Sequence, residues 1–134
     1  MLRYMLDTDT CSYLMKGVSP TLDRRIEQAG VDAVCMSVIT KAELLYGVGI
    51  SPHPSRDGEA LKLLLTYLQV LDMPEEAAVH YAEIRADLKR RGVPIGANDL
   101  LLAAHARCLG LTLVTNNTAE FGRVKGLAVE NWAA

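Results

Sequence analysis

The chain has 134 residues, of which 50% are hydrophobic and 22% charged, and its formal net charge is −2 at pH 7. These values predict one globular domain over residues 1–134 and exclude a disordered chain. They also exclude a uniformly basic nucleic-acid binder, so any contact with nucleic acid must come from a local basic patch.

The sequence is not expected to carry an export signal. The start, MLRYMLD, lacks the apolar segment of a signal peptide, and no apolar run reaches the ~18 residues of a membrane span. The three cysteines, Cys11, Cys35 and Cys108, have no CxxC spacing. We therefore expect free thiols in a reducing cytoplasm and no zinc site.

Short apolar runs alternate with helical patterns along the chain. Strands are expected at residues 2–6, 33–36, 70–71, 111–114 and 127–129. Helices are expected at about residues 10–16, 19–29, 38–48, 57–69, 75–91 and 99–109, and the segment GISPHPSRDGE is expected to be an exposed loop. This α/β alternation predicts a three-layer α/β/α sandwich with a central parallel sheet.

The helix expected at residues 99–109 has almost no polar face, because it begins with the run DLLLAA. It should therefore be central and buried. His105 lies on it and is expected to be a core histidine or a support to a nearby site. His53 and His80 form no spaced pair with another metal ligand.

An apolar run that ends on two acids, YMLDTDT, contains the first candidate site residue. In an open parallel sheet, ligands gather beyond the carboxyl ends of the strands, which favours a catalytic role for Asp7. The alternative is that Asp7 or Thr8 caps the following helix. Asp9 shares a face with Asp7 if the backbone stays extended, and otherwise is itself an N-cap.

Three later acids have both a structural and a functional interpretation. Glu43 fits a capping box with Thr40, but its apolar neighbours equally favour a helix pressed on the core, where a carboxylate needs a partner. Asp99 either complements the dipole of its helix or lies beside Asp7 at the sheet edge. Glu120 follows the strand that ends in Thr115, Asn116 and Asn117.

Convergence of these acids would create an electrostatic problem. Two carboxylates ~4 Å apart repel by ~4 kcal/mol at an effective dielectric of 20. Three or four converging acids must therefore take up protons or bind a cation. Mg²⁺ and Mn²⁺ suit such a site, because they prefer oxygen ligands and retained waters.

Four segments resemble the motif blocks of PIN-domain ribonucleases, in the order and spacing of VapC-type toxins. They are YMLDTDTCSYLMKG, SVITKAELLYGV, PIGANDLLLAAHA and LVTNNTAEFGRVKGL, and the similarity runs from about residue 2 to residue 132. The resemblance implies that Asp7, Glu43 and Asp99 are catalytic and bind metal, with Glu120 as the fourth acid. It also implies that the hydroxyls of Thr8, Ser37 and Thr115 line the site. Asp9, Asn116 and Asn117 are further candidates for its outer shell, because they follow the ends of strands. Many relatives have Asn at the position of Asp9, and many have Asp near Asn116 or Asn117.

The same resemblance implies a function. It is that of a Mg²⁺- or Mn²⁺-dependent endoribonuclease toxin that hydrolyses phosphodiester bonds in a structured RNA such as tRNA. A cognate VapB-like antitoxin and homodimerisation are implied as well. Candidate RNA-binding residues are Lys41, Arg85, Lys89, Arg90 and Arg91, with Lys16, Arg24 and Arg25 as further cations. For residues 89–91 the alternative is complement to the helix dipole.

Two other functions are weighed against the nuclease. One is a PIN-like RNA-binding or protein-interaction module without catalysis, which the three acids disfavour. The other is a phosphatase of the haloacid-dehalogenase type, suggested by DTDT after a strand. The motif of that phosphatase family has Thr or Val at the position of Cys11, and no Gly-Asp-x-x-x-Asp block follows in this sequence.

Overall fold

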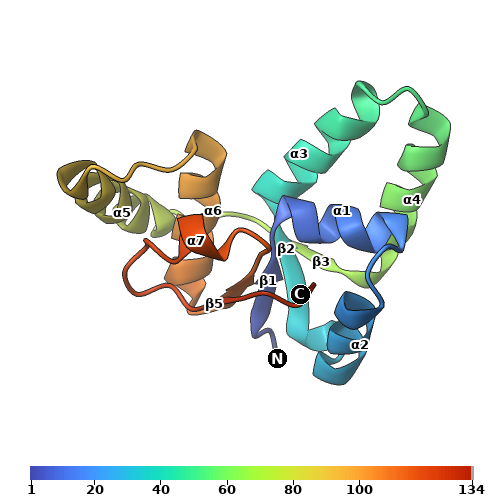
Figure 1. Cartoon of the computed structure of the whole chain (residues 1–134), viewed down its shortest axis with the longest axis horizontal. Helices are drawn as coiled ribbons and strands as arrows, with labels where there is room; N and C mark the ends of the chain where they lie inside the picture. The colour runs from blue at the N-terminus through green and yellow to red at the C-terminus, as the bar shows by residue number, and fades with distance from the viewer. Residues whose placement is uncertain (134) are drawn as a thin grey trace.

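A five-stranded sheet forms the centre of the molecule, whose computed structural model describes residues 1–133 (Figure 1). The strands are β1 (Tyr4–Leu6), β2 (Val34–Ser37), β3 (Gln69–Leu71), β4 (Thr112–Val114) and β5 (Val129–Glu130). All neighbours are parallel, in the order β3-β2-β1-β4-β5. The order reverses at β1, and such a switch point opens a crevice beyond the carboxyl ends of the strands.

The helices cover both faces of this sheet. They are α1 (Thr8–Lys16), α2 (Pro20–Ala29), α3 (Val38–Gly49), α4 (Pro54–Tyr67), α5 (Ala77–Arg91), α6 (Ala97–Leu109) and α7 (Thr118–Phe121), with a 3₁₀ turn, η1, at Val31–Ala33. In Figure 1, α5, α6 and α7 lie on one side of the strands and α1 to α4 on the other. Among residues 1–133 no helix combines the length and apolar character needed to cross a membrane.

Alternation along the strands divides the interior into two cores. Met5 of β1 and its register partner Cys35 face the core made with α5 and α6. The next pair, Leu6 and Met36, faces the core made with α1, α2 and α4. Successive strand side chains point to opposite faces, so each strand supplies both cores. The predicted α/β/α sandwich with a parallel sheet is confirmed.

The expectation of a buried sixth helix is also confirmed. Residues 102–106 of α6 are all buried, and His105 has no exposed surface. The loop prediction for GISPHPSRDGE is wrong in its second half, because α4 begins at Pro54. Proline is favoured in the first turn of a helix, where its missing N–H is not needed. The short elements η1 and α7 were not predicted.

Candidate active site

Asp7 lies at the carboxyl end of β1, where the sheet order reverses. Its Oδ1 accepts the Thr10 N–H at 2.9 Å, which makes it the N-cap of α1. Its Oδ2 accepts the Thr115 hydroxyl at 2.5 Å. The side chain is 5% exposed, and burial raises the pKa of its carboxyl, against the lowering effect of these hydrogen bonds. The capping interpretation is therefore right for Asp7. The same residue also lies at the carboxyl end of β1, where a ligand site is expected.

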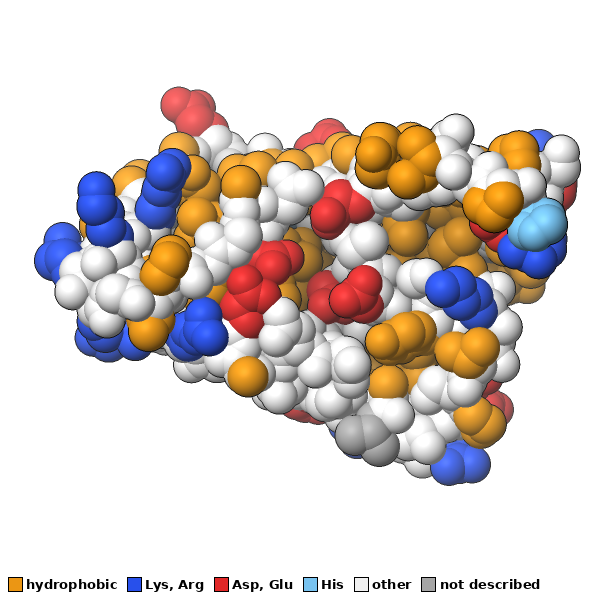
Figure 2. Space-filling model, turned by 45° about the horizontal axis from the view of Figure 1, so that its top comes forward, with side chains coloured by type: hydrophobic (Ala, Val, Ile, Leu, Met, Phe, Trp, Pro, Cys, Tyr) orange, Lys and Arg blue, Asp and Glu red, His pale blue; other side chains and the backbone are white. Residues whose placement is uncertain are grey.

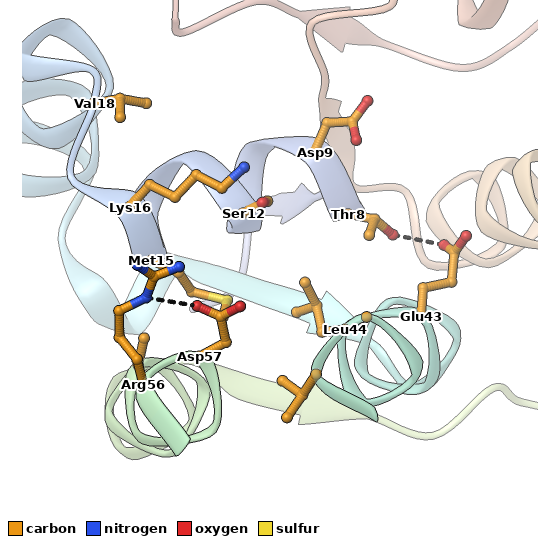
Figure 3. A pocket seen from close by; sticks show the side chains of 13 residues that line it. Thr8, Asp9, Ser12, Met15, Lys16, Val18, Glu43, Leu44, Arg56 and Asp57 are labelled. Atoms are coloured by element: carbon orange, nitrogen blue, oxygen red, sulfur yellow. Dashed lines mark hydrogen bonds and ion pairs between the residues drawn. The ribbon is translucent and has the colours of Figure 1, made fainter. Parts of the chain in front are cut away.

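Glu43 joins three helices. Its Oε1 accepts the Thr8 hydroxyl at 2.6 Å, and its Oε2 accepts the Asn98 amide at 3.2 Å, so α3 is tied to α1 and α6 (Figure 3). The capping-box interpretation is wrong, because the N-cap of α3 is Ser37, six residues earlier. The Ser37 side chain accepts the Ile39 N–H at 3.0 Å.

Asn98 was missed by the sequence analysis. It stands directly before Asp99 in the first turn of α6 and is exposed. An exposed polar residue at a helix start is ordinary, and only its contact with Glu43 distinguishes it.

Asp99 and Glu120 form a pair at the start of α6. Burial, the charge of Glu120 and a hydrogen bond to it raise the pKa of Asp99 to about 7, and the charges of Glu43 and Asp7 contribute further. Glu120 accepts the Gly96 N–H at 3.1 Å and is also bonded by the Asn117 amide. The structure thus places the other three predicted acids within electrostatic reach of Asp99.

Acidic side chains gather in the middle of one face of the molecule (Figure 2). The four acids take part in none of the ion pairs found among residues 1–133. Within these residues, the donors that bond the four acids are hydroxyl, amide and backbone N–H groups. This is the electrostatic situation that binding of a cation would relieve.

Carboxylate and amide oxygens match the ligands that Mg²⁺ and Mn²⁺ prefer. Within the described part of the chain, however, no three His, Cys, Asp or Glu side chains are gathered closely enough to hold a metal ion. The donor chemistry fits a hard cation, and Asp99 and Glu120 are instead joined to each other.

The residues expected to line the site divide into two groups. Thr8, Thr115 and Asn117 donate hydrogen bonds to the acids. Ser37 and Asn116 do not, since the Ser37 hydroxyl pairs with His105 Nδ1 at 2.8 Å and the Asn116 side chain accepts from Asn131 at 3.1 Å.

Asp9 lies in the first turn of α1 and is exposed. The N-cap interpretation is wrong for it, because Asp7 occupies that position. Its contribution is its charge, which adds to the raised pKa of Asp7.

A groove of about 680 Å³ extends from the acids between α1, α3 and α4 (Figure 3). Thr8, Asp9 and Glu43 line its near end, and Lys16 and Arg56 line it further out. Arg56 is paired with Asp57 at 3.2 Å.

The predicted RNA-binding cations also separate in the structure. Arg91 is held by Asp87 at 2.6 Å and by the Arg123 carbonyl, so it fastens α5 to the chain that follows α7. Arg85 donates to the Tyr81 hydroxyl at 2.8 Å. Lys89 and Arg90 are exposed at the end of α5, and Lys41 is half-buried on α3.

The fold and this acidic crevice define a class of protein: residues 4–127 match the PIN domain, and the chain belongs to the PIN-domain family. Within that family the similarity is to VapC proteins. The chain is 39% identical to the tRNA(fMet)-specific endonuclease VapC of Salmonella typhimurium, over 98% of this chain and 99% of that protein. It is 42% identical to the ribonuclease VapC2 of Haemophilus influenzae, with the same coverage of both chains.

A solved structure agrees with these sequence relatives. The DNA-bound VapBC of Salmonella typhimurium contains a chain that superposes with a TM-score of 0.93 at 39% identity. The superposition covers 98% of this chain and 99% of that one. The likeness therefore extends over the whole fold and is not restricted to the motif segments.

Proposed function

We propose that this protein is a VapC-type endoribonuclease that uses a divalent metal ion to hydrolyse RNA phosphodiester bonds. The observation that carries the proposal is the convergence of Asp7, Glu43, Asp99 and Glu120 at the switch point of the sheet, where none of the four forms an ion pair within residues 1–133. Membership of the PIN-domain family and nearly full-length likeness to named ribonucleases support it.

The four acids would hold Mg²⁺ or Mn²⁺. When bound, such an ion lowers the pKa of a coordinated water and stabilises negative charge on the phosphate. Asp7 is the fixed member, because Thr10 and Thr115 hold both of its oxygens. Glu43 is oriented by Thr8 and Asn98.

Asp99 is the proposed general base. A base is most effective when its pKa lies near the working pH, and the pKa of Asp99 is raised to about 7. Its carboxylate would accept a proton from the attacking water as the water oxygen bonds to phosphorus. The bond from phosphorus to the 3′-oxygen would break, and solvent would protonate the departing oxygen, which leaves a 5′-phosphate and a 3′-hydroxyl. Glu120 lies against Asp99 and sustains its raised pKa through charge.

Replacement of Asp7 by Asn tests the assignment. Asn keeps an oxygen for the Thr10 N–H and the helix cap, so the fold should survive, whereas RNA cleavage should fall by orders of magnitude. The matched control is Asp32→Asn, which removes an exposed acid in η1, before the amino end of β2. Near-normal cleavage by Asp7→Asn with saturating Mn²⁺ would refute the proposal.

A catalytically inactive PIN-like module is the second candidate. It is favoured by the absence, among residues 1–133, of three acids already gathered for a metal ion. Calorimetric titration with Mn²⁺ separates the two functions. The nuclease should bind Mn²⁺ in the wild type and lose that binding in Asp7→Asn, whereas the inactive module should bind none in either form.

The partners follow from the same likeness. The Salmonella typhimurium relative is a VapBC complex, and we infer that a VapB-like antitoxin neutralises this chain. A structured RNA such as tRNA is the proposed substrate, in line with the name of the relative from that organism. Homodimerisation is part of the proposal, and light scattering of the purified chain would measure it.

A further inference from the structure

A second pocket lies on the other side of the acids, between α5 and the start of α6. It has a volume of about 530 Å³, within the range of small-molecule sites. The lining residues are Tyr81, Arg85, Leu88, Lys89, Gly92, Pro94, Ile95, Ala97 and Leu100. The pocket therefore combines an aromatic ring, an apolar floor and two cations.

This pocket adjoins two of the four acids through Gly96. Ile95 and Ala97 line it, and Gly96 between them donates its N–H to Glu120 at 3.1 Å. A side chain at Gly96 would place its Cβ 3.6 Å from Asp99 Oδ2. An RNA strand that passes over residues 95–97 would therefore contact both the acids and the pocket.

Charge distinguishes this pocket from the groove along α1. The groove is lined by three acids and two cations, whereas the pocket is lined by Arg85 and Lys89 and by no acid. Figure 2 shows the same asymmetry, with Lys and Arg side chains gathered at the end of the molecule where α5 lies. A polyanion leaving the acidic centre is therefore attracted toward α5 and repelled from the α1 groove.

Tyr81 and Arg85 are arranged as a platform. The Tyr81 ring is half-buried against the core of α5 and α6, and Arg85 both bonds its hydroxyl and lies 5.9 Å from its ring centroid. Lys89 projects one turn further along α5 and is exposed. Aromatic faces and arginine planes stack on unpaired bases, while lysine and arginine contact the adjacent phosphates.

We propose that this pocket, lined by Tyr81, Arg85 and Lys89, binds an unpaired nucleotide of the RNA strand adjacent to the bond that is cleaved. The proposal rests on the ribonuclease function proposed above. It assigns base stacking to Tyr81 and phosphate contact to Lys89.

Binding of RNA to the Asp7→Asn protein tests the pocket without cleavage. The probes are a short single-stranded oligouridylate, the same chain without bases, and a duplex of the same length. Tyr81→Ala should weaken oligouridylate binding by ~5- to 150-fold, while the chain without bases and the duplex bind as before. Tyr81→Phe keeps the ring and should bind like the parent.

Salt dependence tests the phosphate contact. Lys89→Ala should make the slope of log affinity against log salt shallower by about 1. The matched control, Lys62→Ala, removes an exposed lysine from α4 and should leave that slope unchanged. Lys89 is exposed, so Lys89→Ala should fold. The salt-dependence measurement therefore tests the pocket even if Tyr81→Ala fails to fold.

Three results would overturn the inference. If the parent binds RNA but Tyr81→Ala and Lys89→Ala bind it equally well, the pocket does not bind the nucleotide, and the proposed ribonuclease function is unaffected. If the parent binds none of the probes and no tRNA, both fail together. If the variants lose the antitoxin complex but retain RNA affinity, the pocket is a protein-contact surface.

Discussion

Replacement of Asp99 by Asn should stabilise the protein at neutral pH while it abolishes cleavage. Burial and, next to it, the neighbouring acids raise the pKa of Asp99 to about 7 from an ordinary 3.8. That gap corresponds to roughly 4 kcal/mol, at ~1.4 kcal/mol for each pKa unit. Asp99 is only partly buried, so solvent screening reduces the figure to about 1–2 kcal/mol.

The sign follows from proton linkage. A carboxyl whose pKa is raised in the folded state binds its proton more tightly there than in the unfolded chain. Its contribution to stability is therefore fully present below pH 3.8 and is lost as the pH rises to about 7. Asn carries no charge at any pH, so the advantage of the variant should grow over this interval.

Thermal unfolding followed by circular dichroism measures the effect. For a chain of this size, 1–2 kcal/mol corresponds to a rise in Tm of roughly 3–8 °C. We expect that rise at pH 7.5 and little difference at pH 3.5. A variant no more stable than the wild type at pH 7.5, or equally more stable at both pH values, would refute the electrostatic reasoning.

Three further outcomes are expected. Millimolar Mg²⁺ should raise Tm at pH 7.5 more than at pH 5, because protons compete at Asp99 below about pH 7, and a chelator should reverse the rise. His105→Leu should lower the free energy of unfolding in urea by ~1–3 kcal/mol, since the buried Ser37 hydroxyl loses its contact with His105 and keeps only the one with the Ile39 N–H, whereas His105→Asn keeps a polar partner and should cost less. Gly92→Ala should cost about 1 kcal/mol in the same assay, because Gly92 ends α5 at φ 70° and a Cβ there strains the backbone.

Much of the fold could be predicted because its signals are local. Apolar runs such as residues 2–6 and long amphipathic patterns such as residues 75–91 specify strands and helices independently of the rest of the chain. The short elements η1 and α7 lack that periodicity. The sequence around Pro54 predicts a loop, but α4 begins there. A proline followed by a helical pattern is equally typical of the first turn of a helix.

The site was only partly predictable from sequence. Asp7 follows a strand, and ligands in a parallel sheet bind beyond the carboxyl ends of the strands. The place of Asp7 in the site could therefore be predicted. Glu43 illustrates the limit. The Thr40–Glu43 spacing fits a capping box, but α3 starts a turn earlier at Ser37, and the contacts of Glu43 with Thr8 and Asn98 join residues far apart in the chain.

The basic cluster shows the same limit. Residues 89–91 are equivalent as a charge run, yet Arg91 is fixed by Asp87 whereas Lys89 lines a pocket. Only the packing of α5 against the following chain separates these two roles.

The positions of the four acids along the chain, at Asp7, Glu43, Asp99 and Glu120, have a consequence for synthesis. A nascent chain that has emerged from the ribosome only as far as α5 carries two of them and lacks the β4 strand on which Asp7 leans. In the proposed mechanism, catalysis must therefore wait until β4, α6 and α7 have also emerged. A cell that makes this enzyme has that interval in which to supply its inhibitor.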